Sequence, residues 1–134
     1  MHDGLHADLT ERIVRCAIEV HRHLGPGLLE SVYEICIAYE LTRRGVRVER
    51  QVPIPVEYRG VLIDVGYKMD ILVEDAVLVE VKSVERLGRI HSAQVLTYLK
   101  LSGLRLGLLI NFNVNRLIDG VRRLVIDAKN PGTR

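Results

Sequence analysis

Hydrophobic residues recur with helical spacing over the first third of the chain. Within residues 8–23 they fall near one stripe, which predicts an amphipathic helix. The Gly- and Pro-containing stretch 24–27 ends that helix, and a second helix is expected over residues 28–44. Gly45 follows at the position where a glycine commonly ends a helix.

The hydrophobic pattern then changes to a period of two, which is typical of strands. Strands are predicted over residues 46–57, 61–73 and 77–84. Pro53 and Pro55 mark the first as an edge strand or an irregular stretch, because proline cannot donate a backbone hydrogen bond. These three strands are expected to form an antiparallel meander.

The last part of the chain returns to a helix over residues 89–102 and then a buried strand over residues 104–111. A turn at residues 119–120 precedes a final strand over residues 121–126. The order α-α-β-β-β-α-β-(β) predicts an α/β fold with a mixed sheet that starts as a three-strand antiparallel meander and is flanked by helices. No repeat or long linker interrupts the sequence, so residues 1–134 are expected to form a single domain.

Composition narrows the class of protein. Apolar residues make up 48% of the 134 residues, which is enough for a packed core. No apolar run approaches the roughly 18 residues of a membrane span, and the first ten residues lack the basic-then-apolar order of a secretory signal. These features predict a soluble, cytoplasmic protein with no membrane contact. The net charge of +2 does not by itself indicate a nucleic-acid binder.

Charged residues interrupt the second and third predicted strands in a regular way. Odd-numbered positions are apolar or aromatic over residues 61–73 and apolar over residues 77–81, whereas Asp70, Glu80 and Lys82 are even-numbered. Directly opposed residues of an antiparallel pair share a face, so burying the apolar faces together forces odd positions to face odd positions. A three-residue turn at 74–76 then sets Asp70 opposite Glu80, with Lys82 one step along on the same face.

Two interpretations of this charged face are open. An antiparallel sheet commonly has one wet face, and a Glu-x-Lys pattern is an ordinary way to cover it. Against this, Leu62, Leu72 and Leu78 share the face, and the helix over residues 89–102 has to cover one face of the sheet. A half-covered carboxylate pair is unfavourable unless something binds there. Mg²⁺, which prefers hard oxygen ligands, is the expected occupant.

Asp70, followed on the next strand by the triplet at residues 80–82 (Glu-Val-Lys), resembles the pattern of the PD-(D/E)xK nuclease superfamily. The stretch GLLESVY at residues 27–33 resembles the signature of the GxxExxY protein family, a branch of that superfamily, with the glycine, glutamate and tyrosine of its name all present. The resemblance covers about residues 21–125 and implies a restriction-endonuclease-like core. Met69 stands where the superfamily's name has a proline, at a position that varies within it.

The resemblance implies a role for each matching residue. Asp70 and Glu80 would be ligands of Mg²⁺ or Mn²⁺, with the Val81 carbonyl completing the protein's share. Lys82 would orient or polarise the attacking water and offset charge that develops on the phosphate. Glu30 would act as a further acid, directly or through a water.

A further resemblance, within the helix predicted over residues 89–102, implies two candidate substrate contacts. Gln94 and Tyr98 are four residues apart, hence on one face, and resemble the QxxxY motif of exonuclease-type members of the superfamily. The alternative is that Gln94 is an ordinary polar helix residue and Tyr98 a core ring. Spacing alone also makes Glu30 an ordinary exposed helix acid, and only the family resemblance assigns it to the site.

The function predicted from these residues is a metal-dependent nuclease that hydrolyses phosphodiester bonds of nucleic acid, with DNA as the expected substrate. The alternative is a catalytically inactive module of the same fold that binds nucleic acid or a protein partner. A chain this short has no separate DNA-recognition domain, so targeting is expected to depend on a homodimer or on another partner.

Overall fold

The structure is a computed structural model that describes residues 4–127. Its helices and strands follow one another in the order α1 (Ala7–Leu24), α2 (Glu30–Arg43), β1 (Val48–Pro53), β2 (Val56–Tyr58), β3 (Val61–Ile63), β4 (Lys68–Val73), β5 (Val77–Lys82), α3 (Arg89–Ser102), β6 (Leu106–Asn111), the 3₁₀ helix η1 (Leu117–Gly120) and β7 (Val121–Val125).

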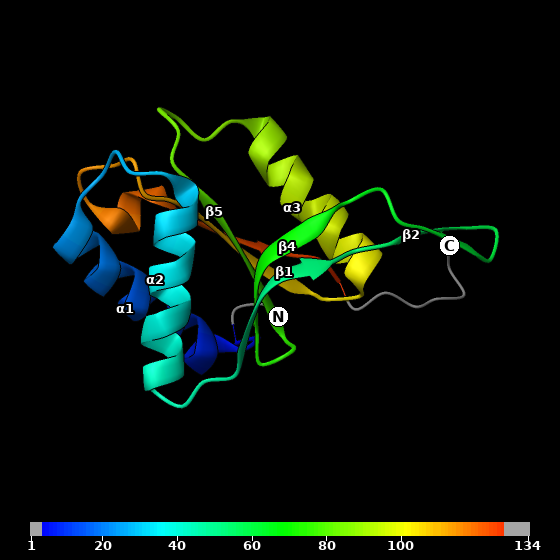
Figure 1. The fold of residues 1–134 in the computed structure, drawn as a ribbon, viewed down its shortest axis with the longest axis horizontal. Coiled ribbons are helices and arrows are strands. Elements are labelled where there is room, and N and C mark those ends of the chain that lie inside the picture. The colour runs from blue at the N-terminus through cyan, green and yellow to red at the C-terminus, as the bar shows by residue number, and fades with distance from the viewer. Residues whose placement is uncertain (1–3, 128–134) are drawn as a thin grey trace.

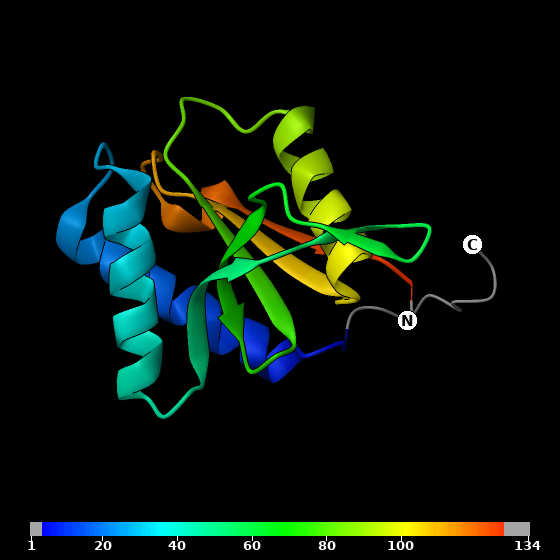
Figure 2. The ribbon, with the colours of Figure 1, turned by 45° about the vertical axis from the view of Figure 1, so that its right-hand side comes forward.

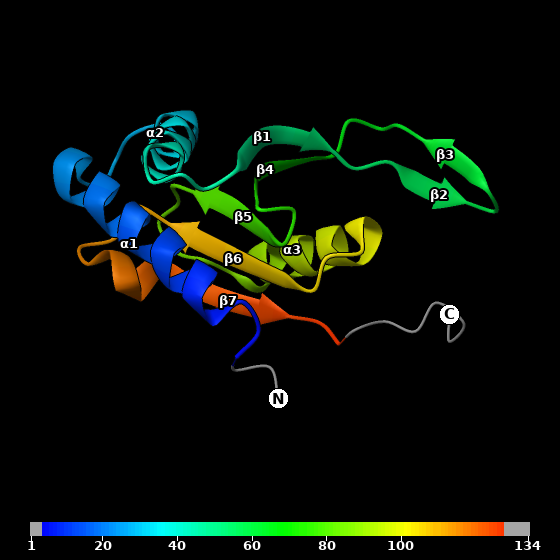
Figure 3. The same cartoon turned by 90° about the horizontal axis from the view of Figure 1, so that it is seen from below.

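Five of the strands form one mixed sheet in the order β1-β4-β5-β6-β7 (Figure 3). β5 and β6 run parallel, with α3 as the crossover that a parallel pair requires, and the other neighbours run antiparallel. The predicted α/β class and the antiparallel meander of three strands are therefore confirmed, with β1, β4 and β5 as its members. The parallel pair is the buried centre, because β6 is buried throughout and β5 is buried at every position except Lys82.

Helices cover both faces of this sheet (Figures 1 and 2). α1 and α2 pack on one face, where the odd-numbered valines of β5 join the larger hydrophobic cluster. α3 packs on the other face against Leu78 and Leu109. Because side chains alternate along a strand, Glu80 and Lys82 lie on the same side of β5 as Leu78, toward α3.

Two of the predicted strands are not continuous, and the predictions over residues 46–57 and 61–73 are wrong in this respect. The first breaks after Pro53 and the second breaks before Lys68. Between these breaks β2 and β3 pair with each other as a separate two-stranded sheet. We call residues 55–67 the arm, since this hairpin projects from the body of the molecule (Figure 1).

The arm also overturns the predicted burial of its apolar residues. Val61 is 59% exposed, Leu62 69% and Val65 55%, so Leu62 does not cover the charged face as expected. Within residues 4–127, β2 and β3 pair with each other in a sheet of their own, outside the five-stranded sheet, and alternation alone cannot reveal that. In the connection between β3 and β4, Gly66 has a φ of +90°, and its N–H donates to the Asp64 carboxylate in a local turn.

The end of the chain agrees with the prediction in part. A final strand forms as expected, and β7 pairs with β6. Asp119 and Gly120 lie in the 3₁₀ helix η1 rather than in a hairpin turn. No helix in residues 4–127 combines the length and the hydropathy needed to cross a membrane.

Gly107 on β6 lets α3 approach the sheet. A Cβ atom at this position would lie 2.7 Å from Cγ1 of Val95, so Gly107→Ala is expected to lower the free energy of unfolding by about 1–3 kcal/mol through overpacking. Gly4→Ala is the matched control, because a Cβ there meets open space. Urea denaturation of both variants checks this, and equal midpoints would contradict the close approach of α3.

Candidate active site

β4 and β5 part in the middle of the sheet. Their pairing ends at Ile71 and Val79, and one further step in the same register sets Asp70 opposite Glu80, as predicted. There the carboxylates bond to the opposite strand. The Asp70 N–H donates to Glu80 Oε2 at 2.9 Å, and the Val81 N–H donates to Asp70 Oδ2 at 2.9 Å. We call this opening between the strands the fork.

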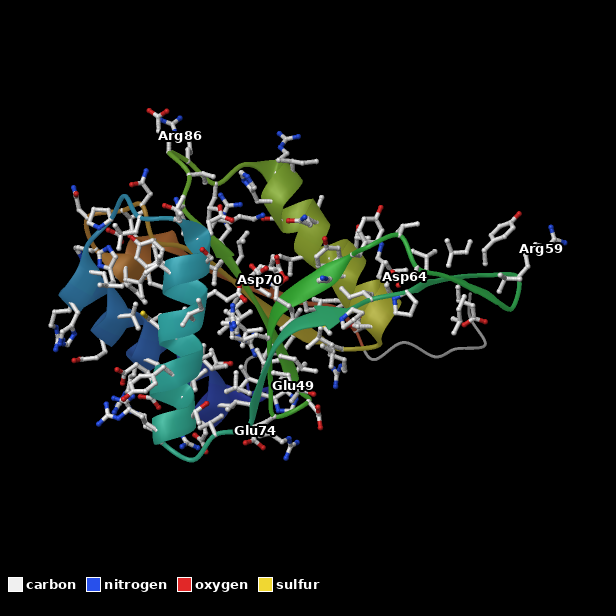
Figure 4. All side chains as sticks on the ribbon, in the orientation of Figure 1. Glu49, Arg59, Asp64, Asp70, Glu74 and Arg86 are labelled. Atoms are coloured by element: carbon white, nitrogen blue, oxygen red, sulfur yellow. The ribbon has the colours of Figure 1, made fainter. Side chains whose placement is uncertain are left out.

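Burial raises the pKa of both acids of the fork, and at Glu80 the charge of Asp70 adds to the effect. Glu80 is only 3% exposed, and desolvation followed by the charge of Asp70 raises its pKa from 4.5 to about 8. Desolvation also raises the pKa of Asp70, although the Val81 N–H partly opposes the rise. The charge of Lys82 acts against both shifts, which places its ammonium group within electrostatic reach of the pair. Figure 4 shows Asp70 near the middle of the molecule, between α2 and α3.

The first turn of α2 approaches the fork from the end of β5. Glu30 Oε2 accepts a hydrogen bond of 3.0 Å from the N–H of Ser83, the residue directly after Lys82. The charge of Glu30 also contributes to the raised pKa of Asp70. Glu30 is thus exposed but held beside the fork rather than pointing away from it.

α3 supplies the opposite wall. Gln94 Nε2 donates to the Tyr98 hydroxyl at 3.3 Å, and burial followed by the charge of Glu80 raises the pKa of Tyr98. Gln94, Tyr98 and Lys82 line a pocket of about 440 Å³, to which the arm contributes Tyr67. The residues selected from the sequence therefore gather from four separate elements around one place.

This arrangement of two acids, a lysine and a helix glutamate can be compared with known families. A family model for the PD-(D/E)XK nuclease superfamily matches residues 7–124. The chain belongs to this superfamily. No curated protein and no solved structure matches the chain significantly.

Divalent metals are the cofactors that PD-(D/E)XK nucleases generally use, and the fork fits such an ion. The two adjacent carboxyl groups form a hard oxygen donor set, and a bound cation would stabilise their ionised forms against the raised pKa values of the metal-free protein. Residues 4–127 contain no group of three or more His, Cys, Asp or Glu side chains placed to hold a metal. The protein's share would therefore be small, which is typical of Mg²⁺ sites that keep several waters and bind substrate phosphate.

A second polar cluster beside the fork was not predicted from the sequence. Glu34 is 4% exposed and accepts hydrogen bonds from Arg50 Nε at 3.1 Å and from Gln51 Nε2 at 2.9 Å. Gln51 lies on β1 between the Arg50–Ile71 and Val52–Met69 pairs, at the position that faces Asp70 of β4, and has a left-handed φ of +55°. The charge of Glu34 contributes to the raised pKa of Asp70. The one available signal was its position, one helical turn after Glu30 on the same face of α2.

Asn111 was also missed, although it holds the segment that follows Lys82. It is 2% exposed, and its side chain both donates to the Val84 carbonyl at 2.9 Å and accepts from the Val84 N–H at 3.0 Å. This pair of bonds continues the β5–β6 pairing beyond the point where the strands end. A single polar residue at the end of a buried strand could have indicated such a role.

The carboxylates of the fork make stability depend on pH when metal is absent. Because the pKa of folded Glu80 lies above its ordinary 4.5, the stability that protonated Glu80 contributes is complete below pH 4.5 and is lost as the pH rises through about 8. In a chelating buffer, the melting temperature should therefore fall between pH 5 and pH 8.5. Glu80→Gln should flatten that fall, and Glu49→Gln, at an exposed position of β1, should leave it unchanged. Circular dichroism melts measure the three profiles, and parallel profiles for wild type and Glu80→Gln would contradict the assignment.

Proposed function

We propose that this protein is a metal-dependent nuclease that hydrolyses phosphodiester bonds of nucleic acid, with DNA as the expected substrate. The observation that carries the proposal is the fork, where buried Glu80 and half-buried Asp70 both have raised pKa values and lie within electrostatic reach of Lys82, in a chain of the PD-(D/E)XK superfamily. A carboxylate pair of this kind destabilises the metal-free fold, so a structural role alone does not account for it. The motif at residues 27–33 supports the finer assignment to the GxxExxY family.

Asp70, Glu80 and the carbonyl of Val81 are the groups proposed to hold Mg²⁺ or Mn²⁺. When bound, such an ion acts as a Lewis acid that offsets negative charge on the phosphate and makes water a better nucleophile. Hydrolysis then forms a bond between a water oxygen and phosphorus, breaks one P–O ester bond, and returns a proton to the leaving oxygen. Lys82 stabilises the charge that the phosphate gains, because its ammonium is a cationic donor already placed at the edge of the fork.

Glu30, Gln94 and Tyr98 are proposed to orient the reactants. Glu30 fixes the backbone directly after Lys82 through Ser83 and retains a second carboxylate oxygen that can position a water. Gln94 and Tyr98 hold each other by their hydrogen bond and present polar atoms to the same pocket as Lys82. Substrate bound there would meet donors from both β5 and α3, which is the geometry that orientation effects require.

Cleavage assays test the proposal directly. Wild-type protein with Mg²⁺ or Mn²⁺ should cleave at least one of four labelled substrates, namely single- and double-stranded DNA and RNA. Lys82→Ala should lower the rate by roughly 10²–10³-fold, the loss seen when one donor to a developing oxyanion is removed. Lys100→Ala, at an exposed position of α3, is the matched control and should cleave at the wild-type rate. Absence of cleavage of all four substrates would instead favour an inactive module that only binds its partner.

Metal binding is tested separately by thermal stability. A ligand that binds only the folded protein stabilises it by about 2.7 kcal/mol at a hundred times its dissociation constant, so Mg²⁺ or Mn²⁺ should raise the melting temperature. Asp70→Asn should abolish the rise, and in chelator it should melt at or above the wild-type temperature because the repulsion within the fork is removed. Calorimetric titration checks the same point, and a metal response that persists in Asp70→Asn would place the ion elsewhere.

A further inference from the structure

The pocket beside Lys82 has a composition that metal chemistry alone does not require. Its volume of about 440 Å³ lies within the range of small-molecule sites. Two tyrosine rings, Tyr67 from the arm and Tyr98 from α3, form part of its wall, and Ile90 lies in the same lining. Asp70 and Glu80 are not among the lining residues, so the pocket adjoins the fork and is separate from it.

The aromatic residues of this pocket differ in what holds them. Tyr98 is 8% exposed and belongs to the hydrophobic cluster beneath α3, so packing explains its presence. Tyr67 is 43% exposed and Ile90 is 74% exposed, and neither belongs to a buried cluster of the described chain. Large apolar side chains left open at the mouth of a pocket indicate a ligand surface rather than a core.

The position of Tyr67 is nevertheless well defined. Its carbonyl accepts a hydrogen bond of 2.8 Å from the N–H of Ile54, which is 2% exposed and packs with the cluster under α3. The Tyr67 and Tyr98 rings lie 5.9 Å apart at 44°, so they meet at an angle and do not stack on each other. A face of Tyr67 therefore stays available to a planar ligand, on a residue whose backbone is anchored.

Planar shape, polar edges and an attached anion describe the ligand that such a lining recognises. A ring stacks on tyrosine, Gln94 offers an amide to a polar edge, and Lys82 attracts a phosphate. A nucleotide has all three features. A base inside a duplex has its faces stacked and its pairing edge occupied, so it can enter a pocket of this kind only after it leaves the helix.

Electrostatics favours the unpaired form as well. Binding along a duplex relies on many Lys and Arg contacts to phosphates, and this chain has a net charge of only +2. Lys82 is the one Lys or Arg side chain among the residues that line the pocket. In proteins that bind single strands, stacking of bases on aromatic rings supplies binding energy that does not depend on many phosphate contacts.

We propose that the pocket between Tyr67 and α3 binds one unstacked nucleobase whose phosphate lies at Lys82, and that the substrate is therefore single-stranded nucleic acid. This inference rests on the proposed nuclease function, because it names the substrate class of the same site. Tyr67 is the residue that the proposal adds, as the stacking surface that sets the preference for unpaired strands.

Equilibrium binding tests the proposal without turnover. Fluorescence anisotropy would compare a labelled 12-nucleotide oligothymidylate, the matching oligouridylate and a DNA duplex of the same length, each with Ca²⁺ in place of Mg²⁺. Wild-type protein should bind the better single strand at least about tenfold more tightly than the duplex, since base stacking contributes about 1–3 kcal/mol per base. The DNA and RNA arms separate the two sugars.

Variants of the pocket decide whether Tyr67 is responsible. Tyr67→Ala should weaken single-strand binding by about 5–150-fold, which is the same 1–3 kcal/mol expressed as an affinity ratio, and should leave duplex binding unchanged. Tyr67→Phe keeps the ring and should bind like wild type. Tyr39→Ala removes a tyrosine that is 62% exposed on α2 and serves as the matched control. Ile90→Ala changes another exposed residue of the pocket and should also weaken single-strand binding. It provides a second test in case Tyr67→Ala has a folding defect.

Two results would overturn the proposal: equal affinity for single strand and duplex, or wild-type affinity in both Tyr67→Ala and Ile90→Ala. Neither bears on whether the fork hydrolyses phosphodiesters, since that is read from cleavage. Conversely, single-strand binding that depends on Tyr67, in a protein that cleaves nothing, would retain the pocket and reject the nuclease.

Discussion

The parting of two paired strands is the constraint on which the rest of this structure depends. Where β4 and β5 separate, the N–H groups of Asp70 and Val81 no longer find a partner across the ladder, and a buried N–H left unbonded costs about as much as a lost hydrogen bond. The carboxylates of Glu80 and Asp70 accept these two bonds. The two acids that we propose as metal ligands therefore also complete the backbone bonding at the fork. Removal of either acid would affect both roles.

The fork lowers the stability of the metal-free protein, although the proposed function depends on it. Glu80 is almost fully buried next to a second acid. Desolvation and the charge of that acid raise its pKa, so the unfavourable charge is relieved by protonation when no metal is bound. Hydrogen bonds hold the structure on both sides of the fork. On one side, Arg50 forms an ion pair with Glu34, and Gln51 donates a hydrogen bond to the same carboxylate. On the other side, Asn111 binds the backbone of Val84, which follows Lys82. A site that is unfavourable in itself needs a frame that does not relax around it.

Side-chain alternation predicted the centre of this fold because burial enforces it. Valines on one side of β5 must face the helices, so the parity of Asp70, Glu80 and Lys82 follows from their numbers alone. The same alternation failed in the arm, where Val61, Leu62 and Val65 repeat the pattern but no layer covers them. The sequence could not predict the long-range contacts of Glu34 for a different reason. The bonds from Arg50 and Gln51 to Glu34 join residues that are 16 and 17 positions apart. Gln51 also has a left-handed backbone conformation, which the local sequence pattern does not predict.

The arm has a consequence for how such a protein can diversify. Its ends leave the sheet at Pro53 and return at Lys68, two residues that pair with each other at the same edge, so whatever lies between them is added to the fold without being part of its core. Mutation or lengthening there disturbs no buried side chain beyond Ile54, whereas loss of either acid at the fork removes a bond between β4 and β5. Proteins built on this fold can therefore differ in their arms while they keep the same sheet and the same fork.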